Sequence, residues 1–190
     1  MNEGPAYRPI PVIATERLIL RPFALDDAPE VQRLAGAREI AEVTANLPHP
    51  YPDGAAELWI ATHAPTFDSG RAIVEALTLR TTGALIGAIS LSVEPKHERA
   101  ELGYWLGVPY WGHGYCTEAA RALVDYGFAE MGLRRIYGRH FGSNPASGRV
   151  MQKVGMLLEG VLREHALKWG RVEDDVYYGL LRSDWEQARR

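Results

Sequence analysis

The stretch from residue 102 to residue 131, LGYWLGVPYWGHGYCTEAARALVDYGFAEM, constrains the fold most, because a strand, a glycine turn and a helix follow one another there. Its first part, up to Val108, is apolar and rich in aromatic side chains, which favours a buried strand. Gly112 and Gly114 then lie one residue apart in a turn. Apolar residues after the turn recur at the spacing of one helical face, at Ala120, Leu123, Val124, Gly127, Phe128 and Met131.

A helix that begins directly after a glycine turn is suited to hold a phosphate group. Its first backbone N–H groups have no partner inside the helix, and they lie at the positive end of the helix dipole. Glycine also allows the backbone to approach an anion closely. We therefore expect the backbone from Gly112 to Thr117 to bind a ligand that carries a pyrophosphate.

Two well-known phosphate loops do not fit this turn. A P-loop continues with Lys and Ser or Thr after its last glycine, whereas Gly114 is followed by Tyr115. A dinucleotide fingerprint has a third glycine or alanine, where this chain has Thr117, and an acidic residue about twenty positions further on. Residues 133–139 contain no acid. On this stretch alone, an ordinary strand–turn–helix joint without a ligand stays open.

Composition excludes several classes of protein. A length of 190 residues predicts one domain, and the net charge of −3 does not indicate a nucleic-acid partner. No apolar run approaches the length of a membrane span, and the first residues do not resemble a secretory signal. The single cysteine, Cys116, cannot form an intramolecular disulfide. We expect a cytoplasmic protein that binds neither membrane nor nucleic acid.

Hydrophobic periodicity and turn residues predict the order of the elements. An extended lead-in is expected over residues 1–14, which hold three prolines, and a single domain over residues 15–190. Asp26 or Asp27 should cap the first helix. The expected strands are 15–22, 71–80, 84–93, 98–108, 135–141, 157–169 and 173–181. The expected helices begin at 25, run from 55 to about 68, hold Thr117 and Glu118 in a first turn, and run from 146 to 154. The order βααβββαβαββ predicts an α+β fold, with a mixed, mostly antiparallel sheet and helices on both faces.

This order and three motifs resemble the GNAT superfamily of acyl-CoA N-acyltransferases, and within it the ribosomal-protein N-terminal (alanine) acetyltransferases. The motifs are TERLILRP at 15–22, AELGYWLGVPYWGHGYCTEA at 100–119 and NPASGRVMQKVGMLLEG at 144–160. The resemblance covers residues 15 to about 185. It implies an enzyme that moves an acetyl group from acetyl-CoA to a primary amine by direct attack, without a metal.

The resemblance assigns the glycine turn to CoA. In the superfamily a Gln/Arg-x-x-Gly-x-Gly/Ala turn surrounds the CoA pyrophosphate, and the six positions here are Trp111, Gly112, His113, Gly114, Tyr115 and Cys116. Gly114 matches the pattern, whereas Trp111 and Cys116 depart from it. Because backbone N–H groups up to Thr117 would hold the phosphates, these departures need not abolish binding. The strand before the turn would hold the pantetheine arm through the backbone of Leu106, Gly107 and Val108.

A second set of candidates lies at the start of the helix after residue 144. Asn144 and Ser147 are three residues apart and can face the same way. The resemblance implies that Asn144 contacts the pantetheine arm. Many members place a tyrosine seven positions later as proton donor to the CoA sulfur, but this chain has Met151 there. We expect Ser147 to be the donor, as in the ribosomal-protein subgroup, unless it only caps the helix. Lys153 is either a ligand of a CoA phosphate or a solvated charge.

Glu101 is the candidate for taking the proton from the amine, through a water molecule. It precedes the CoA turn on the same strand, although alternation could point it away from the cleft into a surface ion pair. Tyr104 has the parity of Leu102 and Leu106, so we expect it to pack in the core.

Cys116 and His113 receive minor roles. A cysteine at a helix start can be a thiolate, but the family transfers the acetyl group directly, and we expect Cys116 to be a small residue in a tight turn. His113 is either a phosphate contact or a solvated loop residue. The six histidines show no metal-binding spacing.

The acceptor amine is only loosely constrained. We expect its pocket to be formed by the loop 44–54, the helix around Trp59, and the turn 165–173 with Trp169. Acids near that turn could attract a cationic amine, namely Glu164, Glu173, Asp174 and Asp175. A protein N-terminus, an aminoglycoside, a polyamine or a small amino compound all fit. A CoA-binding module without catalysis is the alternative of a different class, and the resemblance allows a homodimer.

Overall fold

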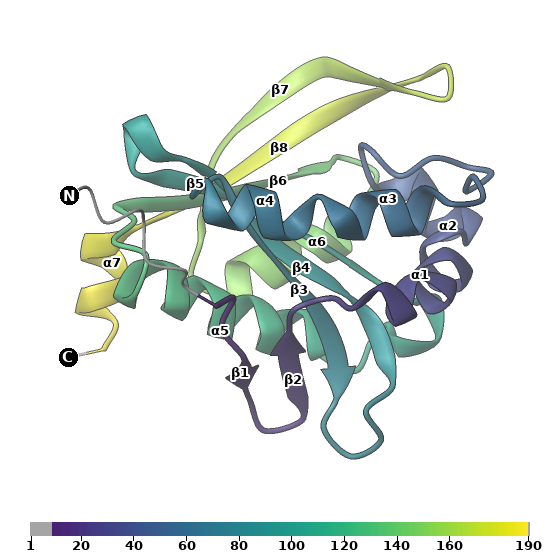
Figure 1. The fold of residues 1–190 in the computed structure, drawn as a ribbon. Helices are drawn as coiled ribbons and strands as arrows, with labels where there is room; N and C mark the ends of the chain where they lie inside the picture. The colour runs from purple at the N-terminus through teal and green to yellow at the C-terminus, as the bar shows by residue number, and fades with distance from the viewer. Residues whose placement is uncertain (1–8, 190) are drawn as a thin grey trace.

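The computed structural model describes residues 9–189, and one sheet of eight strands runs through them (Figure 1). The strand order is β1-β2-β3-β4-β5-β6-β8-β7. The strands are β1 (Ile13–Ala14), β2 (Leu18–Arg21), β3 (Ala72–Leu79), β4 (Leu85–Glu94), β5 (Arg99–Leu106), β6 (Arg135–Phe141), β7 (Leu157–Lys168) and β8 (Arg171–Leu181). Only β5 and β6 pair in parallel, and the other neighbours are antiparallel. The predicted α+β fold with a mostly antiparallel sheet is confirmed.

Helices cover both faces of this sheet (Figure 1). They are α1 (Ala28–Ala35), α2 (Arg38–Val43), α3 (Ala55–Ala61), α4 (His63–Asp68), α5 (Tyr115–Ala129), α6 (Pro145–Lys153) and α7 (Arg182–Gln187). The main core lies where α5 and α6 pack on the sheet. A second core lies on the opposite face, under α1, α2 and α3. No helix among residues 9–189 is long and apolar enough to cross a membrane.

The apolar periodicities place these helices and strands. Leu18 and Leu20 of β2 are fully buried in the main core, as the alternation of TERLILRP predicts. The apolar stripe of α5 is buried from Ala120 to Phe128. Met131 lies beyond the end of α5 and is half-buried against the same core. The central stretch of the sequence therefore folds as its pattern indicates.

The strands β5 and β6 pair only at their beginnings, within the described part of the chain. Their register runs from Arg99 opposite Arg135 to Glu101 opposite Tyr137 and then stops. From Leu102 onward the two strands diverge. Backbone groups of β5 that face β6 are thus released from the sheet, and the starts of α5 and α6 lie beside the opening. This gap positions the candidate site.

Several boundaries differ from the expectation. Most of the expected lead-in falls on residues 1–8, which lie outside the described residues, but its last part, Ile13–Ala14, pairs with β2 as β1. The expected first helix is present as α1, whereas α2 and the α7 helix after the last strand were not predicted. The expected second helix breaks into α3 and α4 at Thr62, because Pro65 has no N–H group to continue the helical bonds.

The expected aspartate cap is also wrong in detail. Asp27 precedes α1, but its side chain makes no hydrogen bond to the start of that helix. Instead, its carboxylate accepts two bonds from the Arg21 guanidinium at 2.7 Å and one from the backbone N–H of Ala24 at 2.8 Å. The Arg21 guanidinium on β2 therefore binds the Asp27 carboxylate in place of the N–H groups at the start of α1.

The β7–β8 hairpin extends from the sheet, and its tip lies near α2 (Figure 1). The pairing shifts register between Leu158 and Gly160 and again between Leu162 and Ala166. At the tip, the Lys168 Nζ donates to the Thr44 carbonyl at 2.7 Å, and Arg171 bonds Glu42 at 3.1 Å. The hairpin thereby holds the segment after α2 over one side of the gap.

Candidate active site

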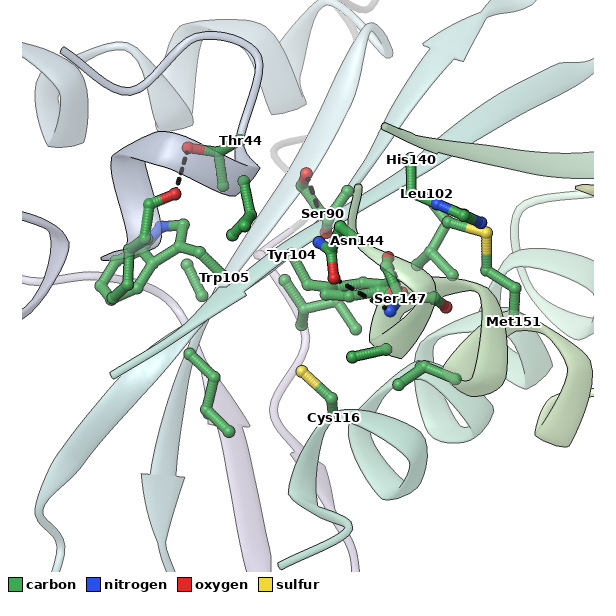
Figure 2. Close-up of a pocket in the computed structure, with 18 of the residues that line it drawn as sticks. Thr44, Ser90, Leu102, Tyr104, Trp105, Cys116, His140, Asn144, Ser147 and Met151 are labelled. Carbon is green, nitrogen blue, oxygen red and sulfur yellow. Dashed lines mark hydrogen bonds between the residues drawn. The ribbon is translucent and has the colours of Figure 1, made fainter. Parts of the chain in front are cut away.

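A cavity of about 580 Å³ occupies the gap between β5 and β6. The turn before α5 and the start of α6 line one end, and residues 40–47 with Trp59 line the other. Figure 2 shows Tyr104, Asn144 and Ser147 grouped at its centre, with Cys116 and Met151 near them and Thr44 on the far side. The cavity therefore joins the predicted CoA turn to the predicted acceptor side.

The turn before α5 presents unpaired backbone donors. Gly112 and Gly114 adopt left-handed φ angles of 79° and 81°, which favour glycine. Within the described residues, the backbone N–H groups from 112 to 117 make no backbone hydrogen bond, whereas that of Glu118 donates to the Gly114 carbonyl at 3.1 Å. These free donors and the helix dipole are the features that the predicted anion site requires.

A side-chain clamp fixes this turn to the connection between β1 and β2, and sequence reasoning missed it. Glu118 Oε1 accepts from the Thr15 hydroxyl at 2.6 Å and from the Arg17 backbone N–H at 2.8 Å, while Oε2 accepts from Arg17 Nε at 2.7 Å. Arg17 Nη1 also donates to the His113 carbonyl at 3.0 Å. Burial alone would raise the pKa of Glu118, but these hydrogen bonds lower it. The signal was present, because TER and Glu118 belong to two of the motifs.

The other predicted residues of the turn have mostly local contacts. The Trp111 indole Nε1 donates to the Leu106 carbonyl at 2.6 Å, which shows that this carbonyl faces the open side of β5. The Gly107 backbone N–H is engaged with the Ile86 carbonyl of β4 at 2.8 Å. By alternation, the backbone of Leu106 rather than that of Gly107 faces the gap.

Of the remaining cofactor candidates, some line the cavity and others lie at its edge. The ring of His113 stacks on Tyr115, with centroids 5.7 Å apart. Val108 follows β5 in a short 3₁₀ turn. The cavity wall includes Gly112, Gly114, Tyr115, Cys116, Thr117, Asn144 and Lys153. Lys153 is at the C-terminal end of α6, where it also borders the groove beside Arg17.

Cys116 packs against the main core at the start of α5. Burial raises the pKa of its thiol to about 12. A thiol with that pKa is protonated at neutral pH and is a weak nucleophile. This environment supports the interpretation of Cys116 as a small residue in a tight turn.

Ser147 is oriented by two partners. Asn144 caps α6, since its Oδ1 accepts from the Ser147 backbone N–H at 3.3 Å. The Ser147 hydroxyl lies 2.6 Å from the Tyr104 hydroxyl, which also donates to the Ser147 carbonyl at 3.1 Å. The capping role considered for Ser147 therefore belongs to Asn144. The hydroxyl of Ser147 remains available at the cavity wall.

Tyr104 and Met151 complete this end of the cavity. The Tyr104 ring packs on the main core, as its parity predicts, but its hydroxyl reaches into the cavity, which parity alone could not indicate. Met151 is almost fully buried beside Gly138, where an added Cβ would lie 2.9 Å from the Met151 methyl group. The tyrosine hydroxyl at this end of the cavity therefore belongs to Tyr104 of β5, while the α6 position at which many family members have a tyrosine is filled by Met151.

Glu101 lines the cavity and does not point away from it. Its Oε1 lies 3.3 Å from Arg139 Nε, and Arg139 Nη1 lies 2.6 Å from Asp175 Oδ2. The Asp175 side chain is almost fully buried, and its Oδ1 has no hydrogen-bond partner in the described structure. Two carboxylates share one guanidinium here, so the cluster carries excess negative charge. Of the four acids expected near the last turn, Asp175 is the one that lines the cavity.

The acceptor end of the cavity is largely apolar. Its wall holds Ile40, Val43, Leu47, Trp59 and Trp105. The expected contribution of loop 44–54 and Trp59 is thus present, while Trp169 of the hairpin tip contacts the ring of His49 at 5.9 Å instead of lining the cavity. Within residues 9–189, no group of three or more histidine, cysteine or acidic side chains could hold a metal ion.

Comparison with known proteins decides the family. A family model described as an acetyltransferase (GNAT) domain matches residues 17–157. The chain belongs to the GNAT acetyltransferase family. This GNAT acetyltransferase uses acetyl-CoA as its acetyl donor and an amine as its acceptor, and the unpaired N–H groups of the α5 turn fit the phosphates of that donor.

Three relatives describe the similarity further. An uncharacterized N-acetyltransferase, YoaA of Bacillus subtilis, is 32% identical over 182 residues, which cover 90% of this chain and 97% of YoaA. A ribosomal-protein-serine acetyltransferase of Escherichia coli is 39% identical over 82 residues, 42% of this chain and 45% of that protein. The ribosomal alpha-N-protein acetyltransferase RimL, solved in complex with coenzyme A, shares the fold with a TM-score of 0.83, 19% identity and coverage of 90% and 98%.

Proposed function

We propose that this GNAT acetyltransferase acetylates the α-amine of a peptide or protein N-terminus, with Glu101 and Ser147 as its acid–base groups. The observation that carries the proposal is that both side chains lie on the wall of one cavity, which begins at the unpaired N–H groups of the α5 turn. The two residues sit on separate elements, β5 and α6, on either side of the strand gap.

Each group has a defined step in the reaction. The amine nitrogen attacks the thioester carbon, and Glu101 takes a proton from that nitrogen, directly or through one water molecule. As the carbon–sulfur bond breaks, the sulfur takes the proton of the Ser147 hydroxyl. Glu101 then loses its proton to solvent and Ser147 regains one, so the net products are the amide and free CoA.

The shape and charge of the acceptor end support a chain terminus as acceptor. Apolar side chains such as Trp59 and Trp105 can pack against the first side chains of a peptide, while Glu101 and Asp175 favour a cationic amine. The E. coli relative acts on a ribosomal protein, as its name states. Polyamines or other small amines are the second candidate, supported by the same negative cluster.

The test is release of free CoA thiol from acetyl-CoA against N-terminal peptides, polyamines, aminoglycosides and small amines. Release that depends on a peptide supports the proposal. Release with polyamines alone would instead show that small amines are the acceptors. No release with any amine, together with tight acetyl-CoA binding by calorimetry, would favour a non-catalytic CoA-binding module. The proposal includes a cytoplasmic location, which rests on the composition of the sequence, and a homodimer, which rests on the family resemblance. Cell fractionation tests the first and light scattering tests the second.

A further inference from the structure

The hydroxyl groups of Tyr104 and Ser147 form a pair that joins the two sides of the strand gap. Tyr104 belongs to β5 and Ser147 to the first turn of α6, and their hydroxyl oxygens lie 2.6 Å apart (Figure 2). Both residues line the cavity at the centre, between the CoA turn and Glu101.

The donors and acceptors of this pair allow two arrangements. The Ser147 carbonyl, 3.1 Å from the Tyr104 oxygen, can only accept. If the phenol proton points to that carbonyl, the Ser147 hydroxyl donates to the Tyr104 oxygen and its proton points away from the cavity. If the phenol proton points to Ser147 Oγ, the serine proton is free to turn toward a ligand. Only the second arrangement makes Ser147 a donor to sulfur.

The Tyr104 hydroxyl keeps its proton at neutral pH. Burial raises the pKa of its hydroxyl above the ordinary value, although the hydrogen bond to Ser147 partly opposes this. A tyrosinate in this apolar surrounding would be unfavourable. The phenol therefore stays protonated and acts through the hydrogen bond that it donates.

We propose that Tyr104 is a positioning residue that moves its hydrogen bond from the Ser147 carbonyl to the Ser147 hydroxyl when CoA sulfur is present. Ser147 Oγ–H is thereby aimed at the sulfur. When the carbon–sulfur bond breaks, the proton passes from Ser147 Oγ to sulfur, and the Tyr104 hydrogen bond stabilises the negative charge on Oγ until solvent returns a proton. This inference rests on the proposed role of Ser147 and extends it to a second residue.

The first experiment is a double-mutant cycle in steady-state kinetics with Tyr104→Phe, Ser147→Ala and the double variant. We expect kcat to fall roughly tenfold in Tyr104→Phe, as for one lost hydrogen bond, and roughly 100-fold in Ser147→Ala. The double variant should match Ser147→Ala, and KM for acetyl-CoA should stay within about twofold. Multiplied losses in the double variant, or a changed KM with unchanged kcat, would overturn the inference.

A matched control separates positioning from support of α6. Tyr178 is also buried, and its hydroxyl accepts from Gln152 of α6 at 3.0 Å. Tyr178→Phe should leave kcat unchanged, while both tyrosine variants are checked for melting temperature. A fall in kcat of equal size in both variants would mean that the tyrosines only hold the helix, and would contradict the inference.

A binding experiment gives an answer that does not need an acceptor. The affinities of CoA and of desulfo-CoA, which lacks the sulfur, are measured by calorimetry for each variant. The wild-type protein should prefer CoA several-fold, and Tyr104→Phe should lose that preference to the same extent as Ser147→Ala. An unchanged preference in Tyr104→Phe overturns the inference. Failure of the proposed function would appear separately, as absence of turnover with every amine in the wild-type protein.

Discussion

Arg17, which directly precedes β2, and Glu118 of α5 form an ion pair, with Arg17 Nε 2.7 Å from Glu118 Oε2. The pair ties the start of β2 to the first turn of the helix that follows the glycine turn. The two residues are 101 positions apart in the chain. Because Arg17 also donates to the His113 carbonyl, the pair holds both sides of the turn. A turn that is fixed before CoA binds loses less entropy on binding.

Replacing Glu118 by alanine should weaken both the fold and CoA binding. The change removes three hydrogen bonds and leaves Arg17 free to move, and we expect a loss of roughly 1 kcal/mol after allowing for the exposed arginine. The melting temperature should fall by about 2–4 °C, and the Kd for acetyl-CoA should rise roughly threefold to tenfold. Thermal unfolding measures the melting temperature, and calorimetry measures the Kd for acetyl-CoA. Glu130→Ala, an exposed glutamate after α5, is the control, and an equal effect there would refute the clamp.

Cys116 should be dispensable for the reaction. Its pKa of about 12 leaves the thiol protonated at neutral pH, although Cys116 lies on the cavity wall. We expect Cys116→Ala to keep kcat within about twofold, and thiol-modifying reagents to react slowly with the folded protein. Trapping of an acetylated Cys116 after incubation with acetyl-CoA would instead demonstrate a covalent route.

Glu101→Gln should reduce turnover without affecting the donor. If Glu101 takes the proton from the amine, kcat/KM for the amine should fall roughly 100-fold, while the Kd for acetyl-CoA stays unchanged. Glu94→Gln is the matched control, because Glu94 also lies on the sheet and pairs with an arginine, Arg99 Nε, at 2.9 Å outside the cavity. Equal rates for the two variants would remove Glu101 from the mechanism.

Glu75 should make the protein less stable as pH rises. This residue of β3 is fully buried, and neither carboxylate oxygen has a partner in the described structure. Burial raises its pKa from 4.5 to about 8, although Arg21 partly opposes this. The folded state therefore holds a proton that the unfolded state has released, so the free energy of unfolding falls between pH 4.5 and about pH 8 and levels off above that range.

The free energy of unfolding should fall by at most about 1.4 kcal/mol per pH unit, because a single proton is released. Glu75→Gln should flatten the dependence in urea unfolding series measured across this range, whereas Glu57→Gln on the exposed side of α3 should leave it as in the wild type. A Glu75→Gln series that runs parallel to the wild type would show that another group causes the dependence.

Local patterns were sufficient for most of the strands and for the main helices. The period-2 alternation of Leu18 and Leu20, the helical stripe after Thr117, and the glycines at 112 and 114 each act through neighbours a few residues away. Such patterns depend on backbone geometry that every chain shares. They were less accurate where a distant partner intervenes, as when Arg21 draws Asp27 away from the helix cap.

The tertiary structure decided which side chains meet. The sequence by itself determined the family of folds, and it singled out the glycine turn and the candidates Glu101 and Ser147, since these lie inside contiguous motifs. It could not place the Tyr104 hydroxyl on Ser147 or Arg139 between two carboxylates, because these contacts join separate elements across the divergence of β5 and β6. The packing of α5 and α6 on the sheet sets the point at which β5 and β6 separate. No local sequence pattern encodes that point.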